Sequence, residues 1–300
     1  MTLLVLGATG LLGSAIMAEA YRRGWEAVGC ARRGAERHLD LEDGQALRAL
    51  VGQIGPDVVL NAAALVNLAT CEADPGLAYR INARPAALLA ELSREFGFFH
   101  VHVSTDHFFL GDGDRAHAED APIRLINEYA CSKYAAEAFA LAGSQALVAR
   151  TNIVGFRPPG SLHPPSFAEW ATAQIEADAP MALFDDFYAS SLDTPTCARA
   201  LLDLAAMRCT GLVNVASSEV ASKRAFIAAM ADAMGRRLTQ ARPGSVRDVP
   251  DGIPRADSLG LDVAKAETLL GYPLPGLRGV IANLLRQRQA LRSDAAPVSR

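Results

Sequence analysis

The stretch Thr2–Gly13, which reads TLLVLGATGLLG, decides the fold of this chain. A short apolar run comes first, three glycines follow in the next seven residues, and a helical apolar pattern continues beyond them. Gly7 permits a tight turn, Gly10 lets the backbone approach a pyrophosphate, and Gly13 lets a helix pack closely against the strand. A purely structural glycine turn is the alternative, but a position between a predicted strand and a predicted helix favours a dinucleotide site.

The first half of the chain repeats this alternation of strands and helices. Apolar runs that predict further buried strands are Trp25–Cys30, Pro56–Ala64, Phe98–Val103 and Gln145–Arg150, and one long helix is expected from Asp74 to about Ser93. We therefore expect residues 1–154 to form a dinucleotide-binding domain, a doubly wound parallel α/β sheet of the Rossmann type. A proline-rich loop then begins at Arg157, and residues 155–300 predict a smaller, mixed α/β, mainly substrate-binding domain, of which part of 181–220 returns to the first domain.

Composition and charge exclude several classes of protein. Half of the 300 residues are apolar and the formal net charge is −4, without a block of Lys or Arg, which argues against nucleic acid or an anionic membrane as a partner. The five cysteines are scattered and form no CxxC pair, which argues against a disulfide framework or a zinc site. No apolar run approaches membrane-spanning length. We expect a cytoplasmic protein that binds no metal, and a homodimer stays open.

Two arginines follow the predicted second strand. A dinucleotide site that prefers NADH carries an Asp or Glu here to hold the ribose 2′-hydroxyl, whereas this chain has Arg32 and Arg33. Guanidinium groups would bind a 2′-phosphate, so we predict that NADPH is preferred over NADH. Two solvated arginines without a ligand are the alternative.

The segment that begins at Asn127 predicts a helix that carries a Tyr and a Lys on one face. Asn127 is a plausible N-cap, and Tyr129 and Lys133 are four residues apart, so their side chains point into the same space. An ammonium close to a phenol is expected to lower its pKa and make proton exchange easier near neutral pH. Such a spacing is also common on solvated helices. However, lysine occurs only three times in this chain, which otherwise uses arginine.

Four motifs in this order carry a resemblance to a known family. They are the glycine turn, Asn61–Ala64, Ser104–Asp106 and the Tyr129–Lys133 pair. Together they resemble the extended short-chain dehydrogenase/reductase superfamily, and within it the dTDP-4-dehydrorhamnose reductase family most of all. The resemblance covers nearly the whole chain. The resemblance implies that the protein reduces a ketone with NADPH and acts in carbohydrate biosynthesis. The ketone that it implies most strongly is a 4-keto-6-deoxy sugar nucleotide.

The resemblance also implies residue roles. Tyr129 would donate a proton to the ketone, Lys133 would lower the tyrosine pKa and bind the nicotinamide ribose, and Thr105 would bind the substrate oxygen. The cofactor-binding residues predicted in all are Gly7, Thr9, Gly10, Leu11, Leu12, Gly13, Arg32, Arg33, Asp40, Leu41, Ala62, Ala63, Ala64, Asn82, Tyr129 and Lys133.

The predicted substrate wall departs from the family pattern. Leu65-Val66 replaces an aromatic residue and a threonine, His107-Phe108-Phe109 replaces Tyr-Val-Phe, and Asn152-Ile153 stands where an aromatic residue is usual. The substrate could therefore be a different nucleotide-linked keto-sugar or another carbonyl compound. The candidate substrate residues are Val66, Asp106, His107, Ile153, Phe187 and Tyr188. The neighbouring acids Asp185 and Asp186 fit a solvated loop better than a metal site.

Two other functions remain open from the sequence. An epimerase or dehydratase of the same fold would keep NAD bound and return the hydride. A non-catalytic NADP-binding regulatory subunit is the second alternative, because the chain also resembles the regulatory beta subunit of methionine adenosyltransferase.

Overall fold

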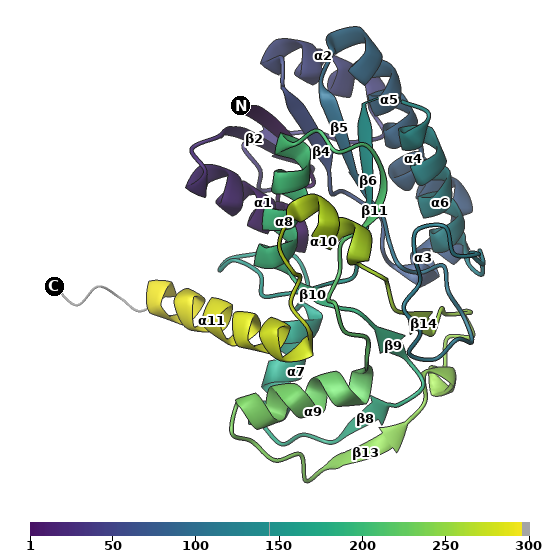
Figure 1. The fold of residues 1–300 in the computed structure, drawn as a ribbon, viewed down its shortest axis with the longest axis vertical. Helices are drawn as coiled ribbons and strands as arrows, with labels where there is room; N and C mark the ends of the chain where they lie inside the picture. Colours follow the sequence, from purple (N-terminus) through teal and green to yellow (C-terminus); the bar gives the residue numbers. More distant parts are fainter. Residues whose placement is uncertain (144, 296–300) are drawn as a thin grey trace, which may run out of the picture.

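The main sheet is parallel throughout and has the strand order of a doubly wound fold. The computed structural model describes residues 1–143 and 145–295. Within them, seven strands form one sheet in the order β11-β6-β5-β4-β1-β2-β3 (Figure 1). These strands are β1 (Thr2–Leu6), β2 (Glu26–Ala31), β3 (Arg37–His38), β4 (Val58–Asn61), β5 (Phe99–Val103), β6 (Ala146–Arg150) and β11 (Gly211–Asn214). The predicted fold class is confirmed, and the order reverses between β1 and β4, where such sheets bind ligands.

Strand β1 shows why the sheet is buried on both faces. Leu3 and Val5 face one apolar cluster, whereas Leu4 and Leu6 face another, and all four are fully buried. A continuous apolar run is what a parallel strand covered by helices on both faces requires.

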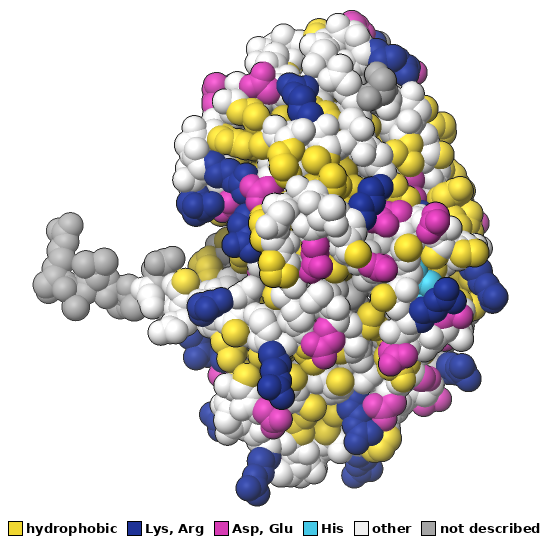
Figure 2. Space-filling view, in the orientation of Figure 1, with side chains coloured by type: hydrophobic (Ala, Val, Ile, Leu, Met, Phe, Trp, Pro, Cys, Tyr) yellow, Lys and Arg dark blue, Asp and Glu magenta, His cyan; other side chains and the backbone are white. Residues whose placement is uncertain are grey.

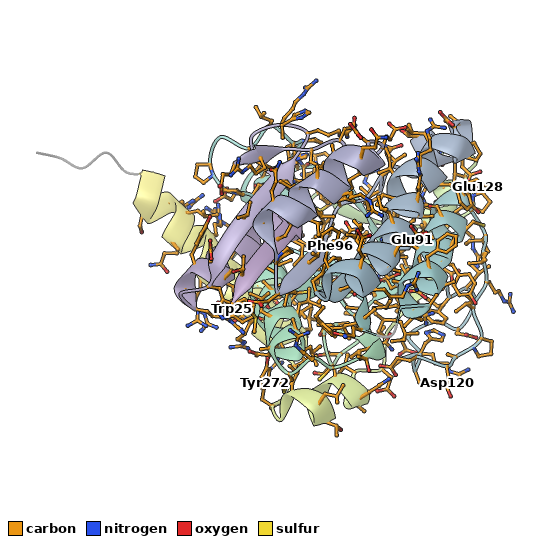
Figure 3. The ribbon with its side chains drawn as sticks, turned by 90° about the horizontal axis from the view of Figure 1, so that it is seen from above. Trp25, Glu91, Phe96, Asp120, Glu128 and Tyr272 are labelled. Carbon is orange, nitrogen blue, oxygen red and sulfur yellow. The ribbon has the colours of Figure 1, made fainter. Side chains whose placement is uncertain are left out.

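Helices cover the two faces of the sheet. They are α1 (Leu11–Arg22), α2 (Gly44–Ile54), α3 (Leu68–Ala73), α4 (Pro75–Asn82), α5 (Arg84–Phe96), α6 (Glu128–Leu141) and α8 (Thr194–Ala206). Helices α2, α5 and α6 pack side by side, and α1 packs against α8. In Figure 3, Glu91 and Phe96 mark α5, whereas Trp25 lies near α1 and Tyr272 lies near α8.

The single long helix expected from Asp74 to Ser93 is wrong. The structure has two helices, α4 and α5, which meet at Ala83. Pro85 stands in the first turn of α5, where a missing N–H group costs nothing, but it could not continue α4 because its ring would clash with the preceding turn. Helix α3, before them, was not expected.

Most of the remaining elements gather at the other end of the molecule, whereas α10 (Ala264–Leu270) packs against α8 and β11 (Figure 1). The elements at that end are β7 (Ile153–Val154), α7 (Phe167–Glu176), β8 (Met181–Phe184), β9 (Tyr188–Ala189), β10 (Leu192–Asp193), β12 (Ala221–Ser222), α9 (Lys223–Ala233), β13 (Ala241–Gly244), a short 3₁₀ helix (Val246–Asp248), β14 (Ser258–Leu259) and α11 (Leu277–Ala295). They form small sheets of two or three strands.

Two elements beyond residue 155 belong to the main sheet in space. Strand β11 pairs in parallel with β6, and α8 packs on α1. We keep the division into residues 1–154 and 155–300 as a proposal, and residues 296–300 lie outside the described part of the chain.

Three properties of the surface and of the helices bear on possible partners. In Figure 2, basic and acidic side chains are interspersed over the face in view. No helix in the described ranges is both long enough and apolar enough to cross a membrane. No group of three or more His, Cys, Asp or Glu residues in those ranges is placed to hold a metal ion.

Candidate active site

The glycine turn joins β1 to α1 through two very close backbone approaches. Gly7 has φ of +80°, and a Cβ there would lie 2.8 Å from the Cα of Ala63. A Cβ on Gly13 would lie 2.1 Å from the carbonyl oxygen of Gly7, so a larger residue requires the backbone to move. Gly10 is the N-cap of α1 and offers no side chain to the first N–H groups of the helix. Free N–H groups at a helix start suit a phosphate.

A cavity of ≈ 1050 Å³ opens beside this turn. Its walls are the glycine turn, the end of β2, the segment after β4 and a loop from the second half of the chain. Of the predicted cofactor-binding residues, the following line it: Gly7, Thr9, Gly10, Arg32, Arg33, Asp40, Leu41, Ala62, Ala63 and Ala64. Small residues, a free helix start and two exposed arginines fit a phosphorylated dinucleotide in both size and charge.

Some predicted cofactor-binding residues do not line this cavity. Leu12 is 4% exposed and packs into the core. The side chain of Asn82 is also buried, and its amide is used by the protein itself. It accepts from the Leu65 N–H at 2.7 Å and donates to the Leu65 carbonyl and to Ser132. Asn82 therefore holds the loop after β4 against α6.

Tyr129 and Lys133 are both buried in the first turns of α6. Asn127 caps this helix, because its side chain accepts from the Ala130 N–H at 2.8 Å. The Tyr129 ring packs on Cys71 and Ala78. The Lys133 ammonium donates to the carbonyl of Val103, the last residue of β5, at 2.7 Å. This bond holds the lysine at the carboxyl edge of the sheet, where Thr105 follows β5.

The expected lowering of the tyrosine pKa is wrong for this structure. Burial raises the pKa of Tyr129 to about 12, and a hydrogen bond with Thr105 only partly opposes it. The neighbouring Asp106 raises it further. Lys133 aims its ammonium at Val103 instead of at the phenol, and burial lowers its own pKa to about 8. The phenol is therefore protonated at neutral pH.

A chain of polar side chains continues from Thr105 away from the tyrosine. Thr105 lies against the buried Asp106 carboxylate, with 3.4 Å between the hydroxyl and Oδ1. Asn152 Nδ2 donates to Asp106 Oδ2 at 2.6 Å, and Ser191 Oγ donates to Asn152 Oδ1 at 2.6 Å. Burial raises the pKa of Asp106 to about 7. The sequence prediction did not include Asn152 or Ser191, although Asn152 follows the end of β6, the same sheet edge as Thr105.

His107 connects the tyrosine with the second half of the chain. Its ring packs edge-on against Tyr129, with 5.5 Å between ring centroids. Burial lowers the pKa of His107 to about 4, and the positive charges of Lys223 and Arg255 lower it further. Phe108 and Phe109, the residues after it, are core residues that do not face the site.

The other predicted substrate residues are spread along the second half and the β4 loop. The Lys223 ammonium lies over two aromatic rings, 4.3 Å from the ring centroid of Phe167 and 5.0 Å from that of Phe187. Tyr188 begins β9 and Ile153 begins β7, both half-buried, whereas Val66 is 66% exposed. Sequence reasoning missed Lys223, although its rarity as a lysine in this chain was a signal.

Comparison with known proteins gives three findings. A family model described as the RmlD substrate binding domain matches residues 1–290. A dTDP-4-dehydrorhamnose reductase of Streptomyces griseus is 39% identical over 134 residues, which span 45% of this chain and 43% of that relative. A dTDP-4-dehydrorhamnose reductase of Mycobacterium tuberculosis is 30% identical over 292 residues, which span 94% of this chain and 92% of that relative.

Solved structures give the same fold. The crystal structure of a dTDP-4-dehydrorhamnose reductase from Bacillus anthracis, in complex with NADP, matches with a TM-score of 0.84 at 20% identity. The match covers 95% of this chain and 99% of that chain. At this identity the likeness shows a shared fold.

Proposed function

This chain belongs to the RmlD substrate-binding family, within the extended short-chain dehydrogenase/reductase superfamily, and we propose that it reduces the ketone of a nucleotide-linked sugar with NADPH. A 4-keto-6-deoxy sugar nucleotide is the proposed substrate, because the Mycobacterium tuberculosis relative bears the name dTDP-4-dehydrorhamnose reductase. The observation that carries the proposal is the arrangement of Tyr129, Lys133 and Thr105, which are buried together at the carboxyl edge of the sheet that also carries the glycine turn.

The protonation state of Tyr129 suits reduction. A ketone that accepts a hydride becomes an alkoxide and must receive a proton, so the enzyme needs an acid at that position. A phenol with a pKa raised to about 12 carries its proton at neutral pH. The Thr105 hydroxyl, which lowers the pKa of the phenol, can orient both the phenol and the substrate oxygen.

The residues that would hold the cofactor follow from the cavity. The glycine turn would bind the pyrophosphate, and Ala62–Ala64 would leave room for the adenosine and ribose. Lys133 does not line the cavity; its role at the nicotinamide ribose is taken from the family resemblance. A bound nicotinamide supplies the hydride. Lys133 keeps most of its charge at neutral pH, because its pKa is about 8 and Glu137, one turn further along α6, opposes the effect of burial.

The choice of NADPH rests on Arg32 and Arg33. Both line the cavity at the end of β2, where an acidic residue would reject a 2′-phosphate. The test is a comparison of Michaelis constants for NADPH and NADH with one ketone substrate. Tighter use of NADH would contradict this choice.

The substrate is tested by NADPH oxidation against a panel of nucleotide-linked keto-sugars and simple ketones. We expect turnover with at least one keto-sugar nucleotide and little with simple ketones. An epimerase or dehydratase would instead carry tightly bound NAD from purification and show no net cofactor turnover. A regulatory subunit would turn over no ketone and would co-purify in fixed ratio with a partner enzyme.

A further inference from the structure

The loop between β7 and α7 is rigid in its own right. It contains four prolines between residues 157 and 165. Its tip, Pro158–Ser161, is a turn closed by a hydrogen bond of 3.2 Å from the Ser161 N–H to the Pro158 carbonyl. Gly160 has φ of +75°, and Pro-Gly at the centre of a turn is the type II pattern. The loop therefore has a defined shape before any ligand binds.

Arg157 anchors the base of this loop. Its Nε donates to the Pro164 carbonyl at 2.9 Å, which joins the two ends of the loop. Its backbone N–H donates to Glu169 at 2.8 Å, in the first turn of α7. Glu169 also completes a capping box with Ser166, so the loop is attached to a well-capped helix.

This rigid loop forms one side of the dinucleotide cavity. Residues 158–163 line the same cavity as the glycine turn and Arg32, although they are more than a hundred residues apart in the chain. Leu162 is a large apolar side chain that lies 77% exposed within this lining. An apolar side chain that exposed at a cavity wall is in position to be covered by a ligand.

His163, next to Leu162, brings a titratable nitrogen to the cationic end of the cavity. His163 and Arg32 line the same cavity. Burial lowers the pKa of the His163 imidazole, and the positive charges of Arg157 and Arg32 lower it further. Arg32 and Arg157 come from different halves of the chain. An anion bound in the cavity beside Arg32 would offset the positive charge around His163 and let the imidazole keep a proton.

We infer that this loop is a second wall of the dinucleotide site, in which Leu162 packs on the adenosine and His163 shares the 2′-phosphate with Arg32. The inference rests on the proposed use of NADPH. It adds a cofactor-specificity residue from the half of the chain that was expected to bind mainly substrate.

The two residues have different expected effects, which makes the test specific. NADPH and NADH binding to the purified full chain is measured by titration calorimetry, without a ketone. Because a charge-assisted hydrogen bond to phosphate is lost, His163→Ala should weaken NADPH binding about five- to tenfold and leave NADH binding within about twofold. His163→Lys should restore most of the NADPH affinity. Leu162→Ala should weaken both cofactors equally, since the adenosine is common to them.

Leu269→Ala, an exposed leucine of α10 outside the cavity, is the matched control and should change neither affinity. Equal effects of His163→Ala on both cofactors, or no effect on either, would overturn the role of His163. Unchanged affinities in Leu162→Ala would overturn the role of Leu162. If the unaltered protein binds neither cofactor, the proposed function itself fails, which is a separate outcome.

Discussion

Two sides of this site differ in the kind of atoms that form them: the side that lines the dinucleotide cavity, here called the cofactor wall, and the proposed substrate wall. The cofactor wall is made mostly of backbone and small residues at the ends of β1, β2 and β4, where a Cβ on Gly7 or Gly13 would meet main-chain atoms. The proposed substrate wall consists of large side chains, such as His107 and Phe187, whose positions depend on contacts between distant segments. A backbone atom in close contact cannot move aside for an added Cβ, whereas one side chain can be replaced by another of similar size. The first wall should therefore be far more sensitive to small substitutions.

The largest effect is expected from Gly13→Ala. The added Cβ would lie 2.1 Å from the Gly7 carbonyl oxygen, and no side chain can move aside to relieve the contact. We expect a loss of about 3 kcal/mol or more in the free energy of unfolding, as for severe overpacking. NADPH binding should fall below detection in the same titration.

The same substitution elsewhere provides the control. Gly52 lies inside α2, and its Cβ would meet only ordinary contacts of 3.5 Å or more with Phe96. Gly52→Ala should stabilise the protein by about 0.5–1 kcal/mol, because alanine is the better helix former. Similar outcomes for both variants in urea unfolding would show that the close backbone approach at Gly13 does not restrict substitution there.

A buried ion pair behind the two walls gives the next largest effect. Glu137 of α6 accepts from Arg150 at 2.8 and 2.9 Å and from Ser104 at 2.6 Å, and both charged side chains are almost completely buried. The pair ties α6, which carries Tyr129 and Lys133, to the ends of β5 and β6. Glu137→Ala should lower the free energy of unfolding by about 3–5 kcal/mol, because it leaves Arg150 buried without a counter-charge.

The exposed pair Arg48–Glu95 is the comparison for that variant. Both of its side chains are about half exposed, so Glu95→Ala should cost less than about 1 kcal/mol. A loss for Glu137→Ala as small as that for Glu95→Ala would show that the buried pair does not hold α6 in place.

A smaller effect is expected on the substrate wall itself. Phe187 lies under Lys223 and outside the dinucleotide cavity. Phe187→Ala should raise the KM for the ketone about three- to tenfold, by loss of apolar contact, and should leave NADPH affinity and kcat nearly unchanged. An unchanged KM would place Phe187 outside the substrate wall, and an equal loss of cofactor affinity would mean that the two walls are coupled.

The last of these predictions concerns the pH dependence of stability. His100 is fully buried in β5, and burial lowers its pKa to about 4, as it does for His107. The unfolded chain takes up these protons near pH 6.5, whereas the folded chain resists them down to about pH 4. The free energy of unfolding should therefore fall as the pH drops from 6.5 towards 4.

Urea unfolding at pH 7.5 and pH 5.0 measures this slope. His100→Gln should reduce it, because glutamine takes up no proton, whereas His38→Gln at an exposed position should not. An identical slope in all three proteins would rule out His100 as a source of the pH dependence.

The sequence predicted the parts of the molecule that local rules determine. The strand, glycine turn and helix at Thr2–Gly13 can be read directly, because only glycine satisfies the two close approaches found there. The family membership and the fold class are confirmed. The break between α4 and α5 was also encoded locally, by Pro85, and was overlooked.

What the sequence did not predict depends on tertiary contacts. Spacing on a helix placed Lys133 beside Tyr129, but the carbonyl of Val103 captures its ammonium, so the tyrosine pKa is raised by burial and not lowered. Asn152 and Lys223 come to the site from other segments, and only the packed structure brings them to Asp106 and His107. Side-chain walls of this kind cannot be derived from periodicity.

The most direct test of the account is the rate of NADPH-dependent ketone reduction by Tyr129→Phe. The phenylalanine keeps the ring that packs on Cys71 and Ala78 and removes only the hydroxyl, so folding and NADPH binding should be preserved. With the proton donor removed, kcat should fall by about 10²–10⁴-fold, the usual contribution of general acid catalysis. A variant that binds NADPH normally and keeps the full kcat would contradict the proposed role of Tyr129.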